Sequence, residues 1–141
     1  MNQFTAGIVP SAAAIAQLTC KVSDFLQEAG VDARAVHHVG LVIDEILTNL
    51  ATHGGNNFAQ ATVVIDVHAD HIAAEIADHG RPFDPRVPAS VDPEAPAEER
   101  EFGGLGLHLV QQLTSALHYR HDGDRNRTTF CIARTQERKK G

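Results

Sequence analysis

The stretch VHHVGLVIDEILTNLATH, residues 36–53, carries the clearest periodic pattern in this chain. Its apolar side chains recur at the spacing of one helical face: Val36, Val39, Ile43, Ile46, Leu47 and Leu50. Leu41 and Val42 add apolar residues off that face, which indicates a helix covered on more than one side. Asp32 precedes the stretch as a capping residue, and Gly54-Gly55 ends it. The sequence therefore predicts a long, largely buried helix here.

A polar stripe runs along this apolar helix. Glu45, Asn49 and His53 follow one another at intervals of four residues, so they lie on one face. A solvent-exposed edge is the ordinary explanation for charged residues on a helix. Residues 39–47, however, leave little exposed face, and an inward carboxylate or amide is costly unless it binds something. The oxygen atoms of a carboxylate beside a carboxamide suit a hard cation such as Mg²⁺.

The segments on either side of this helix have their own signals. Residues 4–9 are apolar and end at Pro10, which favours a first strand. Ser11 is an N-cap candidate and Gly30 stands where a glycine closes a helix, so residues 11–29 predict a helix. After residue 61 the period changes to strict alternation. Strands are predicted at residues 62–69 and 72–77, joined by a turn at Asp70-His71.

Residues 79–102 contain five of the six prolines and many acidic residues, with no helical or strand period. Such a long loop is usually a functional lid or disordered. Gly103-Gly104-Leu105-Gly106 ends it and opens a third helix through Leu113. Strands at residues 117–121 and 128–133, joined by Asp122-Gly123, form a terminal hairpin before a frayed tail at about 135–141. The element order predicts an α/β two-layer sandwich with a mixed, largely antiparallel sheet.

Length and charge limit the classes of function. A chain of 141 residues favours one domain spanning residues 1–141. Its 12 Lys and Arg residues against 18 Asp and Glu residues give a net charge of −6, which argues against nucleic-acid or anionic-lipid partners. The two cysteines form no disulfide framework, and no signal peptide or membrane span is evident. We expect a soluble, cytoplasmic protein.

Two further motifs point to a ligand. Asp78-His79-Gly80-Arg81-Pro82-Phe83-Asp84-Pro85 follows a strand directly; it is either a plain turn or a site where the Asp78 carboxylate accepts a hydrogen bond from an exocyclic amine. Gly103-Gly104-Leu105-Gly106-Leu107 precedes a helix whose N-terminal N–H groups could bind an anion; the alternative is a flexible hinge. This glycine pattern is neither the dinucleotide fingerprint nor a Walker A loop. The nine histidines show no zinc-ligand spacing.

Taken in order, the three motifs resemble those of the GHKL ATPase superfamily. More narrowly, they look like the stand-alone anti-sigma-factor serine/threonine kinases of bacterial partner-switching systems. The resemblance covers residues 4–134, and the sequence Pro82-Phe83-Asp84-Pro85 is typical of this subgroup. It implies the Bergerat, or histidine-kinase-like ATPase, fold, in which about three helices cover one face of the sheet. It also implies one ATP-binding kinase domain with an ATP lid at about residues 86–102.

The resemblance also implies roles for individual residues. Asn49 would coordinate Mg²⁺, and Glu45 would act as the general base or orient the attacking hydroxyl. Asp78 would accept from the adenine amino group, with support from Thr128; Arg127 replaces the glycine that usually precedes this threonine. The glycines before the third helix would cradle phosphate. The implied nucleotide-binding set is Asn49, His53, Asp78, Gly80, Pro82, Phe83, Arg100, Gly103, Gly104, Leu105, Gly106, Leu107 and Thr128.

The function implied by this resemblance is an ATP:protein serine/threonine kinase with Mg²⁺. It would phosphorylate a STAS-domain antagonist protein and sequester a competing partner, either a sigma factor or another effector. Family membership also implies a homodimer. The alternative, from a different class, is a nucleotide-dependent binding module that sequesters its partner with little or no kinase activity.

Overall fold

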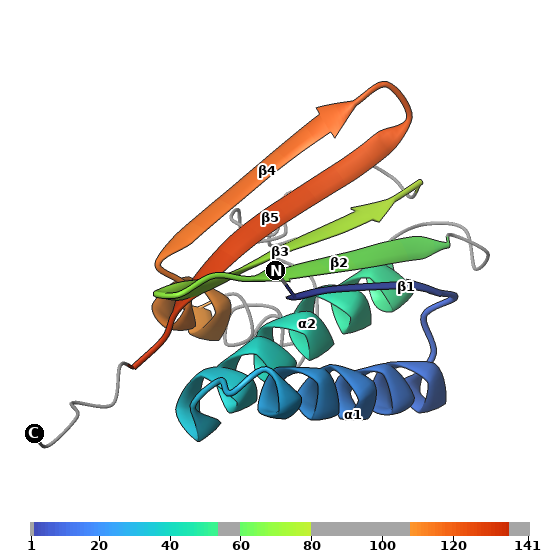
Figure 1. Cartoon of the computed structure of the whole chain (residues 1–141). Coiled ribbons are helices and arrows are strands. Elements are labelled where there is room, and N and C mark those ends of the chain that lie inside the picture. Colours follow the sequence, from blue (N-terminus) through green and yellow to red (C-terminus); the bar gives the residue numbers. More distant parts are fainter. Residues whose placement is uncertain (1, 54–59, 80–107, 136–141) are drawn as a thin grey trace, which may run out of the picture.

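Among the residues that the structure describes, the helices lie on one face of a five-stranded sheet and none lies on the other (Figure 1). The structure is a computed structural model, and it describes residues 2–53, 60–79 and 108–135. Residues 108–113 form a further helical segment, shown in orange in Figure 1. The labelled elements are β1 (Asn2–Ile8), α1 (Ala12–Glu28), α2 (Ala33–His53), β2 (Ala61–Val67), β3 (His71–Asp78), β4 (Ala116–Asp122) and β5 (Arg125–Ala133).

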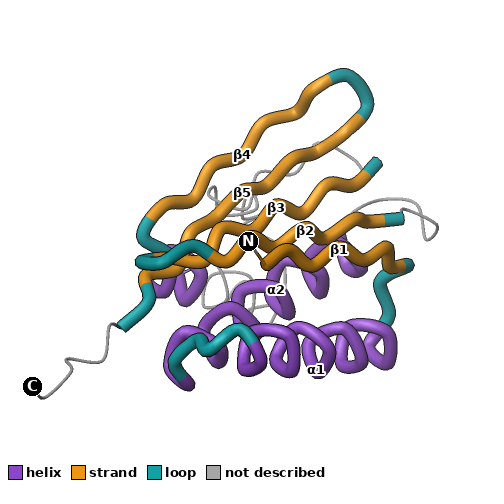
Figure 2. Tube along the Cα trace, in the orientation of Figure 1, coloured by secondary structure: helices purple, strands orange, loops and turns teal. Residues whose placement is uncertain are grey.

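The sheet order is β1-β2-β3-β5-β4, and every strand pair is antiparallel. The α/β two-layer sandwich predicted from the sequence is therefore confirmed, with helices on one side and strands on the other (Figure 2). β3 lies between β2 and β5, so its last residues pair with the first residues of β5. Asp78 is opposite Asn126, and Ile76 is opposite Thr128.

The core lies between the helices and the inner face of the sheet. Alternate residues of the central strands point inward and are buried: Val63, Ile65, Ile72, Ala74, Ile76, Phe130 and Ile132. They meet the buried faces of the helices, which carry Ile15, Leu18, Val22, Leu26, Val39, Val42, Ile43 and Leu47. Val42 lies off the main apolar face of α2 yet is fully buried, which confirms that this helix is covered on more than one side. Burying each large side chain of this kind stabilises the fold by about 1.5–3 kcal/mol.

The predicted helix ends are confirmed in atomic detail. Ser11 Oγ accepts a hydrogen bond from the Ala14 N–H at 3.1 Å, and Asp32 Oδ2 accepts from the Ala35 N–H at 3.1 Å. Gly30 follows α1 with φ 78°, a left-handed conformation that glycine adopts without strain. These caps satisfy N–H groups that the first turn of a helix otherwise leaves without partners.

Two strands begin two or more residues before their predicted starts. β1 begins at Asn2 and β5 at Arg125, in both cases before the apolar residues that the sequence offers as a start. Pairing explains both differences, because Asn2 is opposite Val67 and Arg125 is opposite Asp122. Backbone hydrogen bonds to a neighbouring strand extend an element beyond its apolar pattern.

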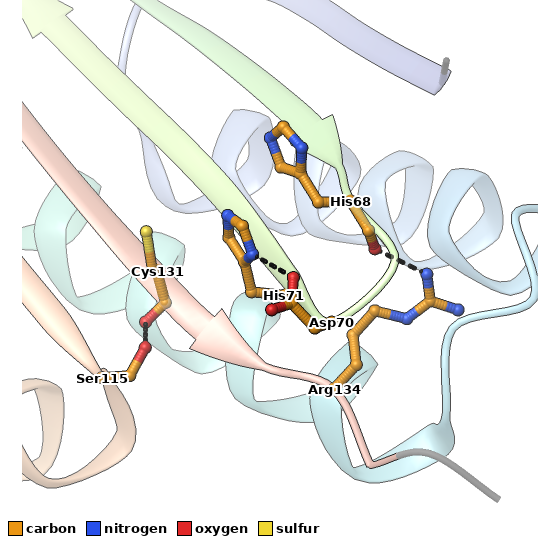
Figure 3. Close-up of polar contacts among 6 residues, drawn as sticks. All are labelled: His68, Asp70, His71, Ser115, Cys131 and Arg134. Carbon is orange, nitrogen blue, oxygen red and sulfur yellow. Dashed lines mark hydrogen bonds and ion pairs between the residues drawn. The ribbon is translucent and has the colours of Figure 1, made fainter.

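The residues after β5 are also more ordered than predicted. The Arg134 guanidinium donates to the carbonyl oxygen of His68 at 2.8 Å (Figure 3). It also donates to the carbonyl oxygen of Gly30 at 3.2 Å. The Thr135 N–H donates to Asp32 Oδ1 at 3.0 Å. Thr135, expected at the start of a frayed tail, is therefore held against the loop that precedes α2; residues 136–141 lie outside the described part. Within the described residues, no helix combines the length and apolar character that crossing a membrane requires.

Candidate functional site

The two described side chains of the polar stripe of α2 are half-buried. Glu45 and Asn49 are both of intermediate exposure, whereas Asp44 beside them is exposed and accepts from Thr48 Oγ1 at 3.1 Å. Burial raises the pKa of the Glu45 carboxyl, and the negative charge of Asp44 raises that pKa further. A carboxyl with a raised pKa is a stronger proton acceptor when ionised, which is the property a general base needs. His53 is the last residue of α2, and its side chain lies outside the described part.

Asp78 is the last residue of β3 and only 7% exposed. It points toward the helix-covered face, because it follows Ile76 and Ala74 at strand alternation. An ionised carboxylate in such a place is costly unless hydrogen bonds stabilise it. Asn126 Nδ2 donates to Asp78 Oδ1 at 3.0 Å, so β5 provides one such bond.

Asn126 is itself held by β4 and is only 2% exposed. Its Oδ1 accepts a hydrogen bond from the Tyr119 hydroxyl, and His121 Nδ1 lies 3.2 Å from the same oxygen. Asn126 is not apparent as a site residue in the sequence, because Asp124-Arg125-Asn126-Arg127 has the polar composition of a turn. The signal that could have found it is strand alternation traced backward from Phe130 through Thr128 to Asn126.

Thr128 is buried at 4% exposure and stands opposite Ile76, one inward position along the sheet from the Asp78–Asn126 pair. Asp78 and Thr128, which the resemblance links, therefore lie on neighbouring strands of the same face. Arg127 lies within β5, and among the described residues only glycines have positive φ. The usual glycine is therefore not needed here. The Arg127 side chain points to the opposite face, where Nη1 donates to Glu75 Oε1 at 3.3 Å.

The fold brings the polar stripe of α2 and the Asp78 end of β3 to the same end of the molecule. α2 packs on β5, and Figure 1 shows the C-terminal half of α2 and the end of β3 that carries Asp78 extending in the same direction. Several predicted ligand contacts, and the predicted lid at residues 86–102, lie outside the described part. These contacts are Gly80, Pro82, Phe83, Arg100, Gly103, Gly104, Leu105, Gly106 and Leu107.

Other features of the described residues do not form a competing site. A cavity of about 230 Å³ on the helix-free face of the sheet is lined by Val64, Glu75 and Thr129 among others, and none of the predicted site residues lines it. The His68 and His71 rings stack at 4.4 Å, but no group of three or more His, Cys, Asp or Glu side chains in the described part could hold a metal ion.

The residues present fit the groups that the resemblance implies. Asn49, half-buried on α2, carries an amide oxygen of the kind that Mg²⁺ takes as a ligand. A buried carboxylate such as Asp78 can accept from an amino group of a base.

Comparisons with known proteins agree with the fold and the motif order. The family model of the histidine kinase-like ATPase domain matches residues 8–132. A serine-protein kinase RsbW of Oceanobacillus iheyensis is 27% identical over 110 residues, which are 74% of this chain and 68% of that protein.

Two solved structures share the fold. One contains the RsbU and RsbW domains of a Mycobacterium tuberculosis protein, with a TM-score of 0.70 and 15% identity; the likeness covers 98% of this chain and 34%, about a third, of that one. The other is the SiaB-SiaC complex from Pseudomonas aeruginosa, with a TM-score of 0.59 and 16% identity over 92% of this chain and 89% of that one. Since the family model matches nearly the whole sequence, this chain belongs to the histidine kinase-like ATPase domain family.

Proposed function

We propose that this protein is an ATP-dependent serine/threonine protein kinase and an anti-sigma-type regulator of a partner switch. The observation that carries the proposal is Asp78, a buried carboxylate fixed at the end of a central strand on the face that α2 covers. The similarity to RsbW serine-protein kinases supports the kinase assignment.

The chemistry of Asp78 indicates which nucleotide the proposed site prefers. An ionised carboxylate accepts a hydrogen bond from the adenine amino group, whereas it would meet the carbonyl oxygen of guanine. ATP is therefore preferred to GTP. Asn49 would bind Mg²⁺, which when bound neutralises negative charge on the phosphates.

Glu45 would accept the proton of the reaction. The oxygen of a serine or threonine hydroxyl attacks the γ-phosphorus of ATP, the bond from that phosphorus to the bridging oxygen breaks, and ADP leaves. The proton of the hydroxyl goes to the Glu45 carboxylate, whose raised pKa favours the transfer. Phosphoryl transfer needs positioning and charge neutralisation more than covalent help from the protein, so a domain of this size suffices.

The proposed phosphate acceptor is a small STAS-domain protein, as the resemblance to partner-switching kinases implies. The second proposed partner, either a sigma factor or another effector, would compete with it for a homodimer of this chain in the cytoplasm. The net charge of −6 agrees with protein partners rather than nucleic acid or anionic membrane.

The test is incubation of the full chain with radiolabelled ATP, Mg²⁺ and a STAS-domain protein from the same organism. We expect label on a serine or threonine of the STAS protein, at a rate that falls in Glu45→Gln and is unchanged in Glu28→Gln, an exposed position on α1. A nucleotide-dependent complex without label transfer would instead establish the binding module. Absence of both ATP binding and complex formation would refute the proposal.

A further inference from the structure

We infer that Asn126 is a positioning residue that orients the Asp78 carboxylate for the adenine base, and that Tyr119 holds Asn126 in place. The inference rests on the proposed nucleotide site. It assigns adenine selectivity to a relay across three strands, β4 to β5 to β3.

The relay is continuous in hydrogen bonds. The Tyr119 hydroxyl of β4 donates to Asn126 Oδ1, and Asn126 Nδ2 of β5 donates to Asp78 Oδ1 of β3 at 3.0 Å. His121 Nδ1 adds a second polar contact to Asn126 Oδ1 at 3.2 Å. Register places these groups together, because Asp78 and His121 are each the strand partner of Asn126.

The chemistry of the partners fixes the orientation of the Asn126 amide. An ionised carboxylate only accepts hydrogen bonds, so the amide NH₂ group must face Asp78. The opposite orientation would place the amide oxygen against the carboxylate oxygen, which is repulsive in a buried setting. The amide oxygen then faces Tyr119, whose hydroxyl donates. Each group in the relay therefore has a single low-energy arrangement.

This arrangement matters for recognition because a carboxylate at the end of a strand can rotate about its side-chain torsions. The bond from Asn126 holds one oxygen and so restricts the plane that the carboxylate can adopt. A base is read through that plane, since hydrogen bonds to a carboxylate lie near it. Without Asn126 the carboxylate would remain, but it would lose a hydrogen bond that holds it in its direction toward the adenine amino group.

Asn126→Leu is the first test, because leucine has a similar volume and no donor. We expect ATP affinity to fall about 10- to 100-fold, the range for a lost hydrogen bond to a charged group. GTP affinity should change little, so the ATP-over-GTP preference collapses. Calorimetry with both nucleotides and Mg²⁺ measures this, below the melting temperature of each variant. Thr129→Val is the matched control, since it removes a polar group from the same strand on the opposite face.

Asn126→Asp is the second test, and its readout is pH. Two buried carboxylates about 3 Å apart cannot both ionise easily, so they share a proton at lower pH. The shared proton restores a donor between the two side chains. We expect the ratio of variant to wild-type ATP affinity to fall at least about tenfold between about pH 6 and pH 8.5. Using the ratio cancels the ionisation of the nucleotide phosphates.

The outcomes separate the relay from simpler explanations. If Asn126 only stabilises the fold, Asn126→Leu lowers the melting temperature while its folded form keeps wild-type ATP affinity and preference, and the inference fails. A pH-independent ratio for Asn126→Asp also overturns it. If Asn126→Leu does not fold, Tyr119→Phe is the deciding variant, because it removes only one hydroxyl. A reduced ATP-over-GTP preference in Tyr119→Phe supports the relay, and an unchanged preference refutes it. A wild-type chain that binds no ATP, by contrast, refutes the proposed function itself.

Discussion

Glu45 has a cost in stability as well as the role of proton acceptor that we propose for it. Burial, and then the charge of Asp44, raises the pKa of its carboxyl. The folded state therefore holds the Glu45 proton to higher pH than the unfolded state does. Stability falls as pH rises from the unfolded pKa, about 4.3, through the raised folded pKa. A group that destabilises the fold at neutral pH is better explained by function than by structure.

Glu45→Gln should separate the two roles. Because the amide keeps the shape and loses the proton acceptor, phosphate transfer to the STAS protein should drop by about 10²- to 10⁴-fold. ATP affinity should stay near the wild-type value, and the free energy of unfolding at pH 7.5 should not decrease. Single-turnover radiolabel transfer, calorimetry and urea unfolding measure the three quantities. Transfer at the wild-type rate would show that Glu45 is not the base.

Asn49→Ala should affect ATP binding as well as phosphate transfer, unlike Glu45→Gln, although Asn49 lies on the same stripe of α2. Removing a proposed Mg²⁺ ligand should lower nucleotide affinity and transfer together. The check is ATP affinity measured with Mg²⁺ and with EDTA. In the wild type, chelation should weaken binding, and in Asn49→Ala the difference between the two conditions should shrink. An Asn49→Ala variant with the full Mg²⁺ effect would contradict the assignment.

At the scale of elements, helices were more predictable than strands. The ends of α1 can be predicted from Ser11 and Gly30, because a capping serine and a helix-closing glycine are recognised from the sequence alone. The start of β5 is not, because Arg125, Asn126 and Arg127 have no apolar pattern and become strand only by pairing with β4 and β3. The same limit applies to the site. Asp78 and Thr128 belong to motifs, whereas the Asn126–Tyr119 contact depends on the register of the β4–β5 hairpin, and the Asn126–Asp78 contact depends on the pairing of β5 with β3.

The N-cap of α1 provides a quantitative test at this scale. Ser11 Oγ accepts from the Ala14 N–H, which has no intrahelical partner at this position. Ser11→Ala should therefore lower the free energy of unfolding by about 1 kcal/mol. Ser23→Ala, within the same helix, is the control and should cost less, because alanine has the higher helix propensity. Urea unfolding monitored by circular dichroism gives both values; equal effects of the two substitutions would argue against the cap.

At the scale of the whole molecule, the loop between α1 and α2 ties the helix layer to the end of the sheet. Asp32 accepts from the Ala35 N–H through Oδ2 and from the Thr135 N–H through Oδ1. Arg34 reaches the same segment, donating through Nε to Thr135 Oγ1 at 3.2 Å and through Nη2 to the Ala133 carbonyl at 3.3 Å. One carboxylate thus starts α2 and anchors the chain after β5.

Asp32→Asn should reveal this anchor through pH. Burial alone would raise the pKa of Asp32, but the backbone hydrogen bonds from Ala35 and Thr135 outweigh it and hold the pKa of this carboxyl below its usual range. The stabilisation is therefore complete above the unfolded pKa, about 3.9, and is lost as pH falls through the lowered folded pKa. Asparagine caps a helix about as well as aspartate, so the loss in unfolding free energy at pH 7 should be about 1 kcal/mol, from the bond to Thr135.

Urea unfolding of both proteins at pH 7 and below pH 3 isolates Asp32, because the other carboxylates are common to both. The difference in unfolding free energy should shrink toward zero at the lower pH. A difference that persists undiminished would mean that the Asp32 charge contributes nothing to the anchor.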